Sequence, residues 1–173
     1  DAVLLMAASP RPIRFLMDHR IFRMPVLGSL FKLAKAIPIA PQKDDALAYE
    51  RAFEQALQVL REGDLLAIFP EGAITRDGEL QPFKAGTRKI LDMAQAEGMD
   101  VPVVPMALSN LWGSYFSRIE VRNGDRVAMV RPFRRGLFSR VGLSVGSAMA
   151  ASEAGLEHLQ TRVRELLTAS PIR

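Results

Sequence analysis

Short apolar runs alternate with amphipathic stretches along the first two-thirds of the chain. The runs are continuous, as in buried strands, whereas the amphipathic stretches place apolar residues on one face at helical spacing. Strands are expected over residues 13–17, 37–39, 65–69, 101–108, 126–131 and 141–145. Helices are expected over residues 1–8, 25–34, 46–62, 85–97 and 152–167. This alternation predicts an α/β fold, with a mainly parallel or mixed central sheet flanked by helices.

The longest expected helix and the strand after it have clear limits. Asp44 or Asp45 can cap the helix at its start, and Gly63 ends it. One face of this helix carries Ala46, Tyr49, Phe53, Ala56, Leu57 and Leu60. The run Leu-Leu-Ala-Ile-Phe over residues 65–69 is expected as a central parallel strand covered on both faces. No repeat or linker divides the chain, which predicts a single layered domain over residues 1–173.

Composition narrows the possible chemistry. The chain has 173 residues and a net charge of +4, with a pI near 9.8, which suits a partner with acidic groups. It contains no cysteine, which excludes disulfides, thiolate metal sites and a cysteine acyl-enzyme. No apolar run approaches the roughly 20 residues of a membrane span. Asp1 is not a natural first residue, so we expect further sequence upstream of it.

A polar, glycine-containing loop over residues 70–84 is the most informative stretch. It follows a buried strand, and ligands in α/β sheets bind beyond the carboxyl ends of strands. The loop offers the carboxylate of Glu71 and the guanidinium of Arg76, and Lys84 precedes a helix whose start favours anions. These groups suit a phosphate and a polar headgroup; the alternative is a plain loop with an exposed lysine.

Three motifs in order make the chain recognisable. Phe69-Pro70-Glu71-Gly72 is followed a dozen residues later by Phe83-Lys84-Ala85-Gly86, and then by Val-Pro-Val-Val-Pro over residues 101–105. In this order and spacing they resemble the glycerolipid acyltransferase family, which includes the lysophosphatidic acid acyltransferases. The resemblance is best over residues 1–118.

The resemblance implies roles for particular residues. Glu71 and Gly72 match the block that contacts the glycerophosphate acceptor, and Thr75 and Arg76 are expected to help hold it. Lys84 and Gly86, at the start of the next helix, are expected to bind the acceptor's phosphate. Val103, Val104 and Pro105 match the block that shapes the acyl site. The family needs no metal and no bound cofactor, since acyl-CoA or acyl carrier protein is its co-substrate.

Several positions depart from the pattern of lysophosphatidic acid enzymes. Those continue Glu-Gly-Thr-Arg-Ser, whereas this chain has Ala73-Ile74-Thr75, and an isoleucine cannot bind phosphate as an arginine does. The Ile-Thr variant is similar to acyltransferase domains that act on 2-acyl-glycerophosphoethanolamine. Such domains occur in fusions with a lysophospholipid transporter or an acyl-carrier-protein synthetase. The second motif also lacks its usual arginine, and Gln42 and Lys43 stand there instead.

The family's defining motif is His-x-x-x-x-Asp, in which the histidine acts as general base and the aspartate orients it. His19 and His158 lack such an aspartate, because Met24 and Val163 occupy the matching positions. His19 is interpreted as a surface or structural histidine, and His158 as a solvent-facing one. Asp1 precedes an apolar helix, as the motif aspartate does. Asp1 is therefore interpreted as that aspartate, with the histidine five residues upstream; the alternative is a residue that merely starts a helix.

Together these features predict transfer of a fatty acyl group from a thioester to the hydroxyl of a lysophospholipid or acylglycerol phosphate. This chain alone should be nearly inactive without the upstream histidine. The basic, apolar segment over residues 11–35 suits a membrane surface or an acidic carrier protein, or is an ordinary solvated face. We expect the protein at the cytoplasmic face of a bacterial inner membrane, either peripheral or within a fusion.

Three alternatives belong to other classes. An inactive lipid- or acyl-carrier-binding module within a larger membrane fusion protein is the first. A phosphate-ester hydrolase would need metal ligands, and none are recognisable in the sequence. Nucleic-acid binding has little support, since aromatic residues make up 7% of the chain and no recognition motif occurs.

Overall fold

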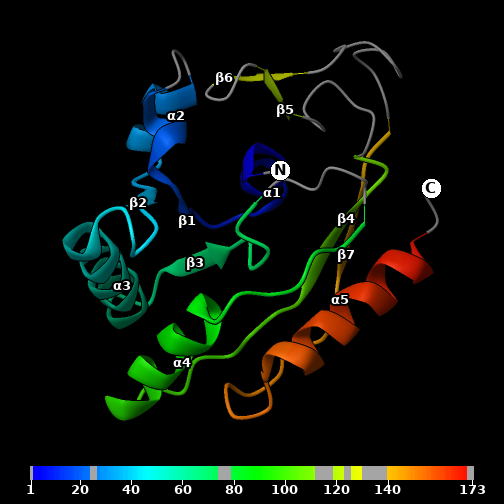
Figure 1. Cartoon of the computed structure of the whole chain (residues 1–173). Coiled ribbons are helices and arrows are strands. Elements are labelled where there is room, and N and C mark those ends of the chain that lie inside the picture. The colour runs from blue at the N-terminus through cyan, green and yellow to red at the C-terminus, as the bar shows by residue number, and fades with distance from the viewer. Residues whose placement is uncertain are drawn as a thin grey trace. The chain divides into compact units, whose positions relative to one another are not determined.

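The structure is a computed structural model that describes residues 2–23, 27–73, 79–111, 119–122, 126–129 and 140–170 (Figure 1). The chain forms two compact units, each described by itself below. The first comprises Asp1–Gly72 and Lys84–Val101, and the second comprises Ala73–Phe83 and Pro102–Arg173.

The first unit is built on a parallel sheet of three strands in the order β2-β1-β3. The strands are β1 (Ile13–Asp18), β2 (Ile37–Ile39) and β3 (Leu65–Ile68). The helices are α1 (Ala2–Ala8), the 3-10 turn η1 (His19–Arg23), α2 (Leu27–Leu33), α3 (Ala46–Arg61) and α4 (Gly86–Ala96). A parallel sheet flanked by helices confirms the predicted α/β class.

Strand β1, rather than β3, is the central strand of this sheet. Leu16 belongs to one apolar cluster, with Ile37 and residues of α3 and α4, whereas Phe15 and Met17 belong to another, with α1 and Phe31 of α2. Since successive residues of a strand point to opposite faces, the sheet is covered on both sides. The expectation that residues 65–69 form the central strand is wrong: β3 ends the described sheet and is half-buried.

Helix α3 follows its sequence prediction closely. The Asp45 carboxylate accepts a hydrogen bond from the Ala48 N–H at 2.9 Å, so Asp45, rather than Asp44, is the N-cap. Phe53 and Ala56 on the apolar face are at most 1% exposed. This face lies against the sheet and against α4, which fixes the helix that follows the polar loop.

The second unit pairs β4 (Met106–Ser109) with β7 (Gly142–Val145), and the pairing is antiparallel. Helix α5 (Leu156–Ala169) contacts both strands, and the hydroxyls of Ser109 and Ser170 lie 2.6 Å apart in the buried layer. A separate antiparallel pair joins β5 (Ile119–Arg122) to β6 (Arg126–Met129). β5 was not expected from the sequence.

Two predicted boundaries in this unit are wrong. The strand expected from residue 101 begins at Met106, because Pro102 and Pro105 have no N–H to donate to a ladder. The last helix begins at Leu156 instead of residue 152, with Gly155 as an N-cap that makes no side-chain hydrogen bond. Within the described ranges, no helix is long and apolar enough to cross a membrane.

Candidate acyl-acceptor site

The carboxyl ends of the three parallel strands lie at one edge of the sheet in the first unit. Leu16 is level with Ile68 of β3, and Asp18 is level with Ile39 of β2. The segments that leave this edge therefore include Asp18-His19 after β1 and the motif over residues 69–72 after β3. This is the position at which open α/β sheets bind ligands.

The motif over residues 69–72 forms a tight turn. The Gly72 N–H donates to the Phe69 carbonyl at 3.0 Å, and Gly72 has a φ of +60°, which favours glycine. The Phe69 ring stacks on Phe15 of the central strand with centroids 6.0 Å apart. Glu71 is half-buried in this turn. The sheet thus anchors the turn that presents Glu71 and Gly72.

Lys84 lies directly against this turn, although it is twelve residues away in sequence. Its backbone N–H donates to the Pro70 carbonyl at 2.8 Å, and its Nζ donates to the Gly72 carbonyl at 3.4 Å. A Cβ atom on Gly72 would lie 2.9 Å from Lys84 Nζ, so any larger residue would push the lysine aside. Lys84 remains exposed. The structure therefore brings Glu71, Gly72 and Lys84 together.

Gly86 opens α4 two residues after Lys84, at a close approach between helices. A Cβ atom there would lie 3.6 Å from the ring of Phe53 on α3. The N-cap residue Ala85 makes no side-chain hydrogen bond, so its side chain covers none of the first N–H groups of α4. Lys84 and the first N–H groups of α4 together give a positive electrostatic character to this side of the turn.

The remaining predicted residues fall elsewhere. Asp1, Thr75 and Arg76 lie outside the described residues. Val103, Val104 and Pro105 belong to the second unit. There Val103 exchanges two backbone hydrogen bonds of 2.9 Å with Met149, and the Pro105 carbonyl accepts from the Gly146 N–H at 2.9 Å. Pro105 is buried, whereas the side chain of Val104 is 41% exposed.

An exposed apolar strip continues from Val104 along the two-stranded sheet. Met106 and Val145, which are opposite each other in the ladder, are 41% and 55% exposed. The other face of the same strands is buried at Ala107 and Ser109. The strip is compatible with the acyl site that the resemblance implies for residues 103–105.

Sequence reasoning missed the pair Asp18-His19. The Nδ1 atom of His19 lies 3.6 Å from Asp18 Oδ1, and Arg20 Nη2 lies 2.9 Å from Asp18 Oδ2. Burial acts to raise the pKa of Asp18, but hydrogen bonds from Arg20 and the charges of Arg20 and His19 outweigh it. The pKa of this carboxyl therefore lies below its ordinary value. No sequence motif marked this pair, because its importance depends on which strand is central.

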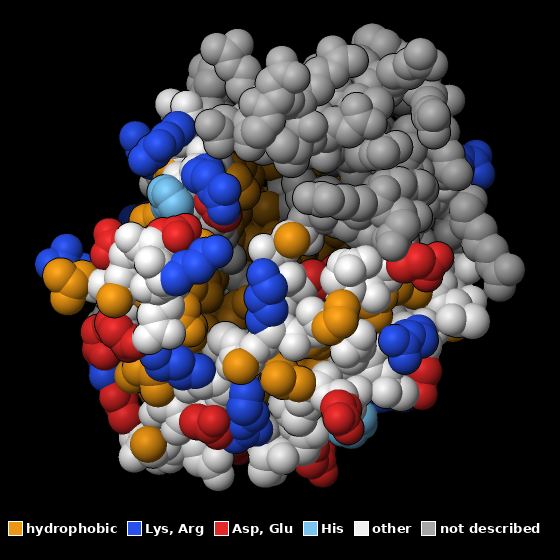
Figure 2. Space-filling view, viewed as in Figure 1, with side chains coloured by type: hydrophobic (Ala, Val, Ile, Leu, Met, Phe, Trp, Pro, Cys, Tyr) orange, Lys and Arg blue, Asp and Glu red, His pale blue; other side chains and the backbone are white. Residues whose placement is uncertain are grey.

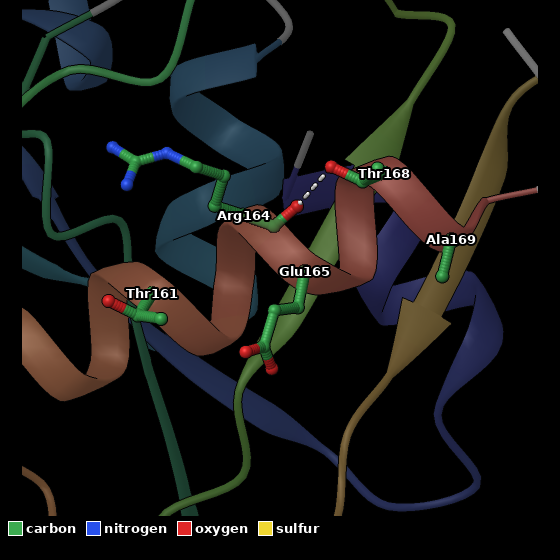
Figure 3. A pocket seen from close by; sticks show the side chains of 5 residues that line it. All are labelled: Thr161, Arg164, Glu165, Thr168 and Ala169. Atoms are coloured by element: carbon green, nitrogen blue, oxygen red, sulfur yellow. Dashed lines mark hydrogen bonds between the residues drawn. The ribbon is translucent and has the colours of Figure 1, made fainter.

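Two further features offer no catalytic arrangement. A shallow hollow on α5 is lined by Thr161, Arg164, Glu165, Thr168 and Ala169 (Figure 3). All five residues come from one helix, and the Thr168 hydroxyl donates a hydrogen bond to the Arg164 carbonyl at 2.9 Å (Figure 3). Among the residues that the structure describes, no three His, Asp or Glu side chains gather as metal ligands would.

The first unit is a parallel sheet flanked by helices, with the turn over residues 69–72 and Lys84 in contact at its edge. The Acyltransferase family profile matches residues 1–109. The chain belongs to this acyltransferase family.

Individual relatives agree with the family assignment. A 1-acyl-sn-glycerol-3-phosphate acyltransferase of Limnanthes douglasii is 33% identical over 110 residues, covering 63% of this chain and 37% of the relative. A chloroplastic 1-acyl-sn-glycerol-3-phosphate acyltransferase of Brassica napus is 30% identical over 95 residues, covering 55% of this chain and 26% of the relative. The chain thus spans roughly a quarter to a third of the length of these relatives.

The fold has a counterpart among solved structures. The crystal structure of the 1-acyl-sn-glycerophosphate (LPA) acyltransferase PlsC from Thermotoga maritima aligns with a TM-score of 0.55. The alignment covers 95% of this chain and 58% of that chain, at 20% identity. At this identity the likeness establishes a shared fold.

Proposed function

We propose that this protein transfers a fatty acyl group from a thioester to the hydroxyl of an acylglycerol phosphate or lysophospholipid. The observation that carries the proposal is the contact between Lys84 and the Glu71-Gly72 turn. Every acceptor of this class carries a phosphate. The groups that suit a phosphate here are Lys84, the exposed backbone of Gly72 and the N–H groups at the start of α4. Membership of the acyltransferase family supplies the reaction class.

Roles follow for the individual residues. Glu71 and Gly72 hold the polar part of the acceptor, helped by Thr75 and Arg76, and Lys84 with the Gly86 end of α4 binds its phosphate. Val103, Val104 and Pro105 contact the acyl chain, where each buried CH₂ contributes about 0.8 kcal/mol. A histidine five residues before Asp1 removes the proton of the acceptor hydroxyl, and Asp1 orients that histidine. Since the chain has no cysteine, the hydroxyl attacks the thioester directly.

The acceptor and the setting are further parts of this proposal. Ala73-Ile74 in place of Thr-Arg removes a guanidinium from the acceptor motif, which favours a lysophospholipid of the ethanolamine type. Acyl-CoA or acyl carrier protein is the donor, and no bound cofactor takes part. The apolar residues Phe15 and Phe31 of the segment over residues 11–35 lie in the core, so the exposed basic side chains of Arg20, Arg23 and Lys32 are the part that faces a membrane surface on its cytoplasmic side. A fused transporter or synthetase is an optional part of this setting.

The direct test measures acyl transfer by the protein with a dozen of its natural residues added before Asp1. Lysophosphatidylethanolamine and lysophosphatidic acid are offered in turn, each with acyl-CoA and with acyl carrier protein as donor. We expect turnover, with the ethanolamine lipid preferred. Absence of transfer to both acceptors with both donors would refute the proposal and leave an inactive lipid- or carrier-binding module.

Substituting Lys84 tests the phosphate contact. Lys84→Met should raise the KM for the acceptor about tenfold, because it removes one charge-assisted contact to phosphate. The KM for the donor should change less than twofold in the same steady-state assay. Arg51→Met is the control, since Arg51 is also an exposed basic residue but lies on α3. Equal effects of the two substitutions would show that general charge, and not this contact, binds the acceptor.

A further inference from the structure

His19 stands at the same sheet edge as the proposed acceptor site. The central strand β1 ends at Asp18, and His19 begins η1 directly after it. The pairing of β1 with β3 ends with Leu16 opposite Ile68, so His19 and the turn over residues 69–72 both follow the same edge of the sheet. In the part of Figure 2 where Figure 1 draws α2 and β2, blue Lys and Arg side chains lie beside a pale-blue histidine and red Asp or Glu side chains.

The environment of the imidazole is asymmetric. Its Nδ1 is buried and makes no hydrogen bond to any described residue, although Asp18 Oδ1 lies 3.6 Å away. The His19 side chain is nevertheless 33% exposed. Nε2 is therefore the ring nitrogen that can reach a ligand outside the protein. An imidazole nitrogen that carries a hydrogen is a donor, so Nε2–H can donate to such a ligand.

The charged groups near the ring are of both signs, and the basic ones are in excess. Asp18 on β1 is bonded through both oxygens by Arg20, with Nε–Oδ1 at 3.0 Å and Nη2–Oδ2 at 2.9 Å. Asp44 is the second acid, and its charge acts on Arg20. The exposed basic residues on the elements packed against each other here are Arg20 and Arg23 on η1 and Lys32 on α2, whereas Arg14 on β1 is paired with Glu62 and Asp64. The excess of basic residues suits an anion.

The turn that carries His19 is held firmly. The Arg20 N–H donates to Asp18 Oδ1 at 2.8 Å, which fixes the first residues of η1. Helix α2 approaches closely from the other end: a Cβ atom on Gly28 would lie 2.4 Å from the Phe22 carbonyl oxygen. Little conformational freedom remains to be lost when the imidazole meets a ligand.

We propose that His19 donates a hydrogen bond from Nε2 to the phosphate group of the acceptor, with Asp18 as its positioning residue. The identity of the ligand rests on the proposed function. The contact acts on acceptor binding and not on the chemical step.

Imidazole NMR tests the contact without any need for turnover. The chain has two histidines, and His158 serves as an internal reference because it lies on α5 with Nδ1 at 2.9 Å from the Glu153 carbonyl oxygen. Glycerol 3-phosphate, added at pH 6, should shift the Nε2 resonance of His19 saturably and leave His158 in place. An unsaturable shift, or equal shifts at both histidines, would overturn the proposal.

Kinetics supply the second readout in the active, extended protein. His19→Asn should raise the acceptor KM about tenfold at pH 6, because it removes one hydrogen bond to the phosphate. His19→Arg keeps a hydrogen-bond donor and should preserve the low KM. His158→Asn is the control and should match the native protein.

The outcomes separate this inference from the proposed function. A saturable NMR shift in a protein that transfers no acyl group would sustain the phosphate contact and refute the function. A hundredfold loss of kcat in His19→Asn with unchanged acceptor KM would refute the contact, since it would identify His19 as the general base. An acceptor KM that is the same in the native protein and in His19→Asn at pH 6 would also refute it.

Discussion

Asp1→Asn should lower kcat by about 10³- to 10⁴-fold in protein that includes the natural residues before Asp1. An aspartate that holds a catalytic imidazole fixes its tautomer and stabilises the charge that forms on it, and an amide does neither. The KM for acceptor and donor should stay within about twofold, because the proposed role of Asp1 involves no contact with either substrate. Steady-state kinetics with lysophosphatidylethanolamine and acyl-CoA measure both parameters.

Two controls define what this result means. Asp100→Asn changes an exposed aspartate outside the helices and strands and should leave kcat unaltered. Replacing the histidine five residues before Asp1 should cost at least as much as Asp1→Asn, and the double substitution should add little, because paired catalytic groups act as a unit. A loss below tenfold in Asp1→Asn would mean that Asp1 only starts a helix.

Much of the first unit was predictable because its signals are local. The carboxylate of Asp45, the stop at Gly63 and the apolar face around Phe53 specify α3 without reference to the rest of the chain. The positive φ of Gly72 likewise belongs to a turn that the motif marks. Where one residue and its neighbours decide a feature, the sequence pattern indicates it.

Other features depend on which segments meet. Hydropathy marks residues 65–69 as buried but does not show that β1 lies between β2 and β3. The role proposed for His19 depends on that order, whereas the sequence alone indicated a surface or structural histidine. The apolar run over residues 101–108 predicted a strand along its whole length. The strand begins only at Met106, because Pro102 and Pro105 have no N–H group to donate.

The same distinction applies to the candidate site. Family motifs indicated Glu71, Gly72 and Lys84 separately, and their spacing of a dozen residues did not show contact. The hydrogen bond from the Lys84 N–H to the Pro70 carbonyl, at 2.8 Å, joins the two motifs directly. Backbone pairing of this kind has no sequence signature, because any residue except proline can donate.

Phe53→Ala should lower the free energy of unfolding by about 3–5 kcal/mol, the range for removing a buried aromatic ring. Phe53 is 1% exposed, and its ring contacts Tyr49 with centroids 4.7 Å apart. Lys89 Nζ lies 4.3 Å above the same ring. The substitution therefore removes apolar burial and a cation–π contact together. Urea unfolding followed by circular dichroism measures the change.

The loss should extend to the acceptor site, because Phe53 supports the start of α4. The ring lies 3.6 Å from the position of a Cβ on Gly86, two residues after Lys84, so a cavity there loosens the helix end that carries the lysine. Phe53→Leu should cost less, about 1–1.5 kcal/mol, and Leu47→Ala on the exposed part of α3 should cost under about 0.5 kcal/mol. If Phe53→Ala lost less than about 1 kcal/mol, α3 and α4 would be held together by the Lys89–Glu50 ion pair at 2.9 Å instead.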